Sequence, residues 1–155
     1  MITENMMTSR ILFLLIAVIQ LTNTADLSGR TKVSVSGERW LINGQVTNPG
    51  TEAEGLLTNT RMVNATFEDR FKPGFSADEN ANTFIAGIPG YVNMGVNAFT
   101  LNLQGGMPGY EGALNSAFDP DGSLRGDYMS RVDRVIRACD KNGVIVILGF
   151  FYQRQ

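Results

Sequence analysis

One stretch of the chain, Gly95 to Gln155, constrains the fold more than any other. Its first part, Val96 to Leu103, has the composition of a β-strand. Helical periodicity follows from Asp127 to Asn142, and an apolar strand from Val144 to Tyr152. A strand, a crossover helix and a following strand form a βαβ unit, whose two strands are parallel. Because parallel sheets are covered by helices, the sequence predicts an α/β domain.

The predicted helix of this unit is amphipathic. Its charged residues, Arg131 among them, are assigned to the polar face, where Asp127–Arg131 and Asp133–Arg137 form i,i+4 pairs. Gly143 provides the stop, and Val144 to Leu148 is a continuous apolar run, the pattern of a parallel strand buried on both faces. The apolar face of the helix consists of Tyr128, Val132, Val135, Ile136 and Cys139.

The strand before that helix has two different faces. Phe99, Leu101 and Leu103 make an apolar face that helices can cover. The other face is polar and must turn towards hydrogen-bonding surroundings, because buried amides without partners are costly. The interior of an α/β barrel, open at the carboxyl ends of its strands, meets this need. The alternative is an exposed sheet face, which is uncommon in parallel sheets. The polar face consists of Ala98, Thr100, Asn102 and Gln104.

Upstream of this unit the sequence predicts a hairpin, a strand and a helix. Lys32 to Ser36 alternates apolar and polar residues, and Arg39 to Ile42 returns before the strong turn sequence Asn43-Gly44. Gly55 to Val63 is the predicted first strand of the parallel sheet. A crossover helix follows; Ser76 and Glu79 form its capping box, and Pro89 predicts a break near Ile88.

The first 25 residues resemble a secretory signal peptide. Arg10 precedes an apolar run from Ile11 to Ile19, which is too short to span a bilayer, and small residues follow before Ala25. We therefore expect a secreted or periplasmic protein that begins near Ala25 or Asp26 after cleavage. No cysteine stands directly after the apolar run, so we expect no lipid anchor and no stable membrane anchor after cleavage. The alternative is an amphipathic or buried terminal helix.

Composition excludes several classes of function. The net charge is −2 and no basic run occurs, which argues against nucleic-acid binding. The chain has no histidine, the commonest general base and metal ligand, and we expect no cofactor and no metal. Cys139 is the single cysteine and is predicted to be a buried apolar residue. Asp119-Pro120-Asp121-Gly122 lacks the remaining ligands of a calcium loop and is predicted to be a proline turn.

The order of these segments resembles the amino-terminal part of the cellulase-like (β/α)8 glycoside hydrolases, family 5 and its clan relatives. The resemblance covers about Lys32 to Gln155. It rests on element order and on five segments: Trp40 to Gly44, Gly95 to Thr100, Asp119 to Leu124, Arg131 to Ile136 and Gly143 to Leu148.

The sequence also departs from that family. The family commonly has an arginine near the position of Thr100 and a histidine near Phe151 or Tyr152, and neither is matched. The family's two catalytic glutamates follow the fourth and seventh strands. The chain supplies about three strands of a barrel that typically takes about 250 residues. Glycoside hydrolysis needs paired carboxylates, so the resemblance implies an amino-terminal fragment without them.

Carboxylates near the predicted strand ends do not make a convincing catalytic pair. These are Glu68, Asp69 and Glu111; the charged cluster that contains Glu68 is most simply a solvated loop. The candidate sugar contacts are instead tyrosines, which stack on sugar faces, and amides, which bind sugar hydroxyls. The long segment Gly105 to Leu124 is too aromatic for a mere linker and supplies one of them. The predicted substrate-binding residues are Asn102, Gln104, Tyr110, Tyr152 and Gln153.

We therefore predict an α/β protein that contains about three βα units of a TIM (β/α)8 barrel, preceded by a β-hairpin. The predicted parts are a signal peptide (residues 1–25), the hairpin (26–50) and a partial barrel (51–155). The predicted activity of the full-length protein is hydrolysis of O-glycosidic bonds in oligo- or polysaccharides, with the fragment inactive. One alternative is a non-catalytic secreted carbohydrate-binding or adhesion module. Another is a metal-dependent isomerase barrel, which the absence of histidine disfavours.

Overall fold

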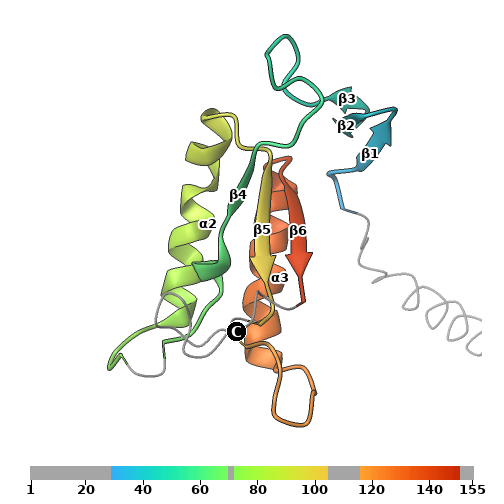
Figure 1. Ribbon diagram of the computed structural model, residues 1–155. Coiled ribbons are helices and arrows are strands. Elements are labelled where there is room, and N and C mark those ends of the chain that lie inside the picture. The colour runs from blue at the N-terminus through green and yellow to red at the C-terminus, as the bar shows by residue number, and fades with distance from the viewer. Residues whose placement is uncertain (1–28, 70–71, 105–115, 151–155) are drawn as a thin grey trace, which may run out of the picture.

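The structure, a computed structural model, describes residues 29–69, 72–104 and 116–150. It is a mixed α/β structure with two three-stranded sheets and two α-helices in this part of the chain (Figure 1). The predicted signal peptide lies outside the described residues, as do Tyr110, Tyr152 and Gln153.

The first sheet is an antiparallel meander. It contains β1 (Val33–Ser36), β2 (Arg39–Ile42) and β3 (Gln45–Val46) in the order β1-β2-β3. The predicted hairpin is confirmed, and β3 extends it by one short strand. Asn43 and Gly44 have φ values of 52° and 78°, which is the positive pair that a two-residue hairpin turn of this type requires.

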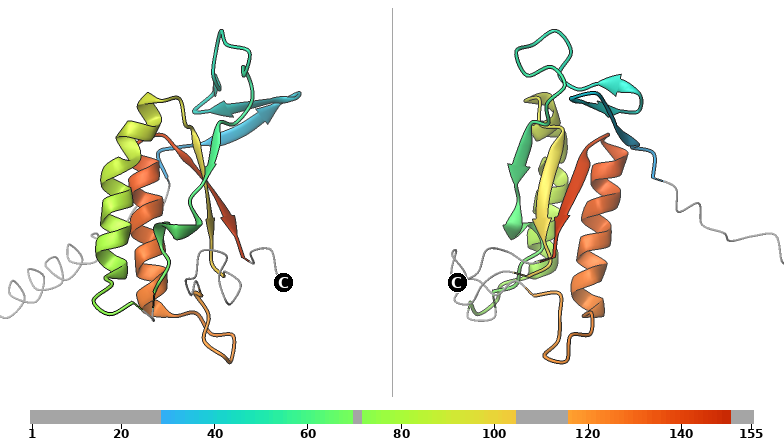
Figure 2. Two further views of the ribbon diagram at one scale, coloured as in Figure 1. Left: turned by 60° about the vertical axis from the view of Figure 1, so that its left-hand side comes forward. Right: turned by 45° about the vertical axis from the view of Figure 1, so that its right-hand side comes forward.

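The second sheet is parallel, as predicted. It contains β4 (Asn59–Arg61), β5 (Ala98–Asn102) and β6 (Ile145–Gly149) in the order β4-β5-β6. A short 3₁₀ helix, η1 (Val63–Ala65), follows β4. Consecutive strands are neighbours, and both crossover helices lie on the same face of the sheet, side by side (Figure 2). The sheet is therefore wound in one direction only.

The first crossover helix is longer than the sequence predicts. Helix α2 (Ala77–Asn93) continues through Pro89, so the predicted break near Ile88 is wrong. Pro89 is exposed, whereas Ile88 is fully buried. Packing on that buried side compensates for the backbone hydrogen bond that an interior proline removes. The predicted cap is confirmed, because the N–H of Glu79 donates to the Ser76 hydroxyl at 3.2 Å.

The second crossover helix, α3 (Gly126–Lys141), matches its prediction closely. Gly143 follows it with a φ of 70°, which confirms the predicted stop. Cys139 is fully buried, also as predicted, and burial raises the pKa of its thiol to about 12. Arg131 differs from its prediction: it is 5% exposed and does not belong to the solvated face of the helix.

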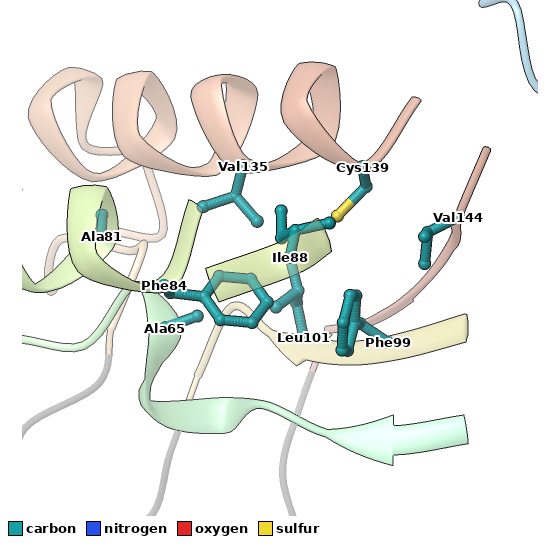
Figure 3. Packing of buried hydrophobic residues seen from close by; sticks show 9 residues of the cluster. All are labelled: Ala65, Ala81, Phe84, Ile88, Phe99, Leu101, Val135, Cys139 and Val144. Atoms are coloured by element: carbon teal, nitrogen blue, oxygen red, sulfur yellow. The ribbon is translucent and has the colours of Figure 1, made fainter. Parts of the chain in front are cut away.

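The main hydrophobic core lies between the parallel sheet and the two helices (Figure 3). Phe99 packs edge-on against Phe84 and Tyr91 of α2, with ring centroids 5.1 and 5.5 Å apart. This arrangement uses the apolar face that the sequence predicts for β5. The buried residues of this core are Ala65, Ala81, Phe84, Ile88, Phe99, Leu101, Val135, Cys139 and Val144.

Strand β6 is not buried on both faces, which corrects the prediction made from its apolar run. Ile147 is 42% exposed, and Phe150, just past the strand, is 61% exposed. The place of β6 in the sheet explains this exposure. β6 is an edge strand of the described sheet, and both helices cover the opposite face.

Candidate functional site

The face of the parallel sheet that points away from α2 and α3 is the candidate site, and we call it the open face. In a parallel sheet, residues in register point to the same side, so pairing identifies its members. Arg61 is in register with Thr100 and Ile147, and Asn102 is in register with Gly149. The open face consists of Asn59, Arg61, Ala98, Thr100, Asn102, Ile145, Ile147 and Gly149.

Polar side chains on the open face bind one another across β4 and β5. The Asn59 amide donates to the Thr100 hydroxyl at 2.9 Å, and that hydroxyl lies 3.1 Å from Asn59 Oδ1, as a donor to it. One hydroxyl can accept and donate at the same time, so it serves both contacts. Asn59 and Arg61 are both exposed. These side chains can present donors and acceptors to a polar ligand lying along the sheet.

Asn102, a predicted substrate-binding residue, is on the open face but is only 5% exposed. Its side chain lies directly over Gly149, where a Cβ atom would collide with Asn102 Oδ1. The prediction placed Asn102 on the correct face at the end of β5. Its burial leaves little side-chain surface for a ligand, so its position favours a structural role in the open face.

Gln104, the other described candidate, lies just beyond β5 and is half-buried. It forms an isolated antiparallel bridge with Ser116, on the far side of the segment that the structure does not describe. The N–H of Ala117 also donates to the Leu103 carbonyl at 2.6 Å. These contacts place Gln104 at the carboxyl end of the parallel sheet, where α/β folds bind ligands.

A buried hydroxyl pair links two strand ends at that edge. Tyr128 is fully buried in the first turn of α3, and its hydroxyl lies 3.1 Å from the Thr66 hydroxyl. The same Tyr128 hydroxyl is 3.3 Å from the Asn102 carbonyl, to which it can donate. Burial raises the pKa of the Tyr128 phenol, which keeps its proton available for that bond. The segment after β4 is thereby connected to the end of β5.

Beside this pair lie three charged residues that we call the charge clamp: Glu68, Arg125 and Arg131. Arg125 holds the Glu68 carboxylate with two hydrogen bonds, of 2.7 and 3.0 Å, and Arg131 donates to the same carboxylate. The side chains of these three residues are 14%, 13% and 6% exposed, respectively. Arg131 also lies over the ring of Tyr128, with 5.3 Å from the guanidinium carbon to the ring centroid.

The charge clamp determines the protonation state of Glu68. Burial acts to raise the pKa of the Glu68 carboxyl, but the hydrogen bonds and positive charges of Arg125 and Arg131 outweigh burial and lower that pKa below 4.5. Glu68 is therefore ionised at neutral pH. A general acid in glycoside hydrolysis needs a raised pKa, so the environment of Glu68 does not suit that role.

The sequence prediction assigned Glu68 to a solvated loop and Arg131 to a surface pair with Asp127. The predicted Asp127–Arg131 pair is present at 3.9 Å, but the solvated positions are wrong, because the side chains of Arg131 and Glu68 are only 6% and 14% exposed and bind each other. One feature of the sequence does point to this arrangement. Arg131 lies three residues after Tyr128 and four before Val135, which places it on the apolar stripe of the helix. The predicted surface pair Asp133–Arg137 is confirmed at 2.7 Å.

Within the described residues, no group of three or more histidine, cysteine, aspartate or glutamate side chains could hold a metal ion. The Asp119–Gly122 segment is a turn, closed by a 2.9 Å hydrogen bond from the N–H of Gly122 to the Asp119 carbonyl, as predicted. No helix in the described ranges is both long enough and apolar enough to cross a membrane.

Comparisons with known proteins find no family model that matches this sequence, and no curated protein or solved structure that matches it.

Proposed function

We propose that this chain is the amino-terminal part of an exported glycoside-hydrolase-like protein with a (β/α)8 barrel. In this proposal the open face is part of the barrel interior, and Gln104 lies at its ligand-binding end. The substrate class is an oligo- or polysaccharide. The observation that carries the proposal is the winding of the parallel sheet: both helices cover one face, and the other face, which carries Asn59, Arg61, Thr100 and Asn102 among apolar residues, has no helix over it in the described part of the chain.

This winding favours a barrel over a doubly wound sheet. In a doubly wound α/β fold, helices cover both faces of the sheet, and its strand order reverses at one point. Here the order β4-β5-β6 follows the chain and both helices lie on one side. In a barrel the same arrangement repeats around a closed sheet, with helices outside and side chains inside.

Grooves beside both edge strands also favour further βα units. A groove of about 920 Å³ beside β6 and α3 is lined by the apolar residues Ile136, Val146 and Leu148, by charged residues of α3 and by the segment 29–31. A second groove of about 470 Å³ lies beside β4 and α2 and includes Met62 and Phe84. Each groove lies where a singly wound sheet would place the next helix against its neighbour.

The meander lies beyond the amino ends of the parallel strands (Figure 1). The Asn97 amide donates to Asn48 Oδ1 at 3.2 Å, and the Thr58 N–H donates to Asn97 Oδ1 at 2.8 Å. The segment just after the meander is thus attached to the residues that immediately precede β4 and β5. In the proposed barrel the meander would cover the closed end and leave the carboxyl ends of the strands for the ligand.

Hydrolysis would require two carboxylates that the open face does not supply. Among the residues of β4, β5 and β6 that form this face, none is acidic, and Glu68 is bound by two arginines. In the proposal, the acid/base and nucleophile belong to further βα units. The described strands provide contacts to sugar hydroxyls rather than the bond-breaking chemistry.

One observation favours the alternative, a non-catalytic secreted carbohydrate-binding module. On the meander, Val35 is paired with Trp40 and Val33 with Ile42, so the four side chains share one face. Trp40 is 39% exposed and Val35 is 57% exposed. An exposed indole on a small sheet can stack on a sugar ring, and this surface would bind a saccharide without the parallel sheet.

The test is saccharide binding by the full chain, measured by isothermal titration against oligosaccharides derived from cellulose, xylan, mannan and β-1,3-glucan. Thr100→Val and Asn59→Ala each remove one member of the polar pair on the open face. Each should weaken binding about fivefold, equivalent to about 1 kcal/mol for a lost hydrogen bond. The matched control is Gln45→Ala, at an exposed position of the meander, which should bind like the wild type. If none of the saccharides binds, or if both open-face variants bind like the wild type, the proposal is wrong.

A further inference from the structure

The charge clamp connects two separate parts of the chain at the carboxyl end of the parallel sheet. Glu68 follows β4, Arg125 immediately precedes α3, and Arg131 lies in the second turn of α3. Arg125 and Arg131 both belong to the start of α3, which lies after β5 in the sequence, whereas Glu68 lies before β5. A group of this kind can fix the distance between the segment after β4 and the start of α3.

Stability alone is a poor explanation for burying these charges. Taking charged groups out of water costs about as much as their mutual attraction returns, and well-packed apolar residues often serve equally well. The neighbouring positions of α3, Val132 and Val135, are such apolar residues and are fully buried. The charged groups instead fix the relative orientation of the segments that carry them, because a guanidinium binds a carboxylate in a fixed planar geometry.

One chain of contacts leads from the clamp to the candidate site. Arg125 Nη1 donates to Glu68 Oε2 at 3.0 Å and also to the Ser116 carbonyl at 3.0 Å. Ser116 is the bridge partner of Gln104. The orientation of one guanidinium therefore depends on Glu68 and supports the backbone that lies against Gln104.

We propose that Glu68 is a positioning residue that, through Arg125 and Ser116, holds Gln104 in place for saccharide binding. This inference rests on the proposed function of the open face. Glu68 itself does not touch the ligand in this account. Loss of its carboxylate frees Arg125 to turn towards Asp127, to which it already donates at 2.8 Å, and the contact to Ser116 weakens.

The test is a double-mutant cycle on the full chain with Glu68→Gln and Gln104→Ala, using the tightest-binding oligosaccharide of the panel described above. Glu68→Gln should raise Kd about tenfold, a change within the range of coupling energies between residues of one hydrogen-bond network. In the Gln104→Ala background the same change should have almost no effect on Kd, because Glu68 acts on the ligand only through Gln104. A purely structural residue would lower the folded fraction without this coupling. The control is Asp133→Asn, which breaks an exposed pair with Arg137 and should leave Kd unchanged.

A ligand-free measurement keeps this inference separate from the proposed function. In ¹H–¹⁵N spectra, Glu68→Gln should shift the backbone amides of Gln104 and Ser116, and the control variant should not. If Glu68→Gln fails to fold, Arg125→Lys replaces it, since lysine keeps the charge but cannot bind two acceptors in the same plane. Unchanged amides of Gln104 and Ser116, or additive effects on Kd, would overturn the inference. Shifted amides in a protein that binds no saccharide would overturn the proposed function and the binding role of Glu68 together, leaving a structural clamp.

Discussion

Replacing Glu68 with glutamine should destabilise the protein far more than its loop position suggests. The change removes the buried carboxylate shared by Arg131, whose side chain is only 6% exposed, and Arg125, at 13%, and leaves them the 59% exposed carboxylate of Asp127. Removing one partner of a buried ion pair typically costs about 3–5 kcal/mol. Because glutamine keeps one acceptor oxygen and Glu68 is slightly exposed, we expect about 3 kcal/mol, at the lower end of that range.

The assay is urea unfolding followed by circular dichroism at pH 7. A loss of about 3 kcal/mol corresponds to a fall of about 1.5 M in the unfolding midpoint, for an m-value of about 2 kcal/mol/M. The matched control is Asp133→Asn, whose pair with Arg137 is more than half exposed on both sides and should contribute under about 1 kcal/mol. If Glu68→Gln changed stability no more than this control, the account of the charge clamp would be refuted.

The stability difference between the wild type and Glu68→Gln should depend on pH, and the lowered pKa of Glu68 determines the sign of that dependence. The pKa of Glu68 in the folded protein is lowered from its ordinary value of 4.5. A lowered pKa contributes stability that is fully present above the unfolded-state value and is lost as pH falls through the folded-state value. The stability difference between the wild type and Glu68→Gln should therefore be constant near neutral pH and shrink as the pH is lowered below 4.5. A difference that grew in acid would contradict this assignment.

Three further predictions concern packing. Gly149→Ala should lower the free energy of unfolding, measured in urea, by about 1–3 kcal/mol, because the new methyl group collides with Asn102. Gly126→Ala, at a glycine with open space around it, should leave the free energy of unfolding unchanged. Equal effects of the two variants would contradict the contact between residue 149 and Asn102. Pro89→Ala should raise the unfolding free energy by about 1–2 kcal/mol, since the helix runs through this exposed proline; a loss of stability would mean that the proline is needed. Cys139 should not react with Ellman's reagent at pH 8 until urea unfolds the protein, because its thiol is fully buried and has a pKa of about 12; rapid labelling of the native protein would show that the core is open.

Local signals in the sequence were sufficient to predict most of the elements. The Asn43-Gly44 turn, the Ser76 cap and the Gly143 stop are each determined by a backbone requirement of a few residues. The parallel pairing of β5 and β6 also followed, because a strand, helix and strand in that order allow few alternatives.

The sequence predictions are wrong where contacts between distant elements determine the local structure. Helix α2 continues through Pro89 because Ile88 is buried beside it, and local propensity alone does not contain that energy. The apolar run of β6 indicated burial on both faces, but Ile147 lies on the face without helices and is exposed. An apolar sequence shows that a residue can be buried, and only the arrangement of the other elements decides whether it is.

The sequence predicts where the candidate site lies better than it predicts which residues form it. Asn102 and Gln104 are at the carboxyl end of β5, as the alternation of the strand indicated. The charge clamp was missed because its members are far apart in the chain: 57 residues separate Glu68 from Arg125. Charged residues are usually solvated, so only a helical position among apolar residues, such as that of Arg131, indicates burial from sequence.

The most direct test of the central claim is a ¹H–¹⁵N titration of the full chain with the same panel of oligosaccharides. If the open face binds the saccharide, the perturbed amides should cluster at Asn59, Arg61 and Thr100, the neighbouring residues of β4 and β5, with Gln104 affected at the strand end. Perturbations confined to Trp40 and the meander would contradict the barrel proposal and favour a binding module. No perturbation by any saccharide would contradict carbohydrate recognition by this chain altogether.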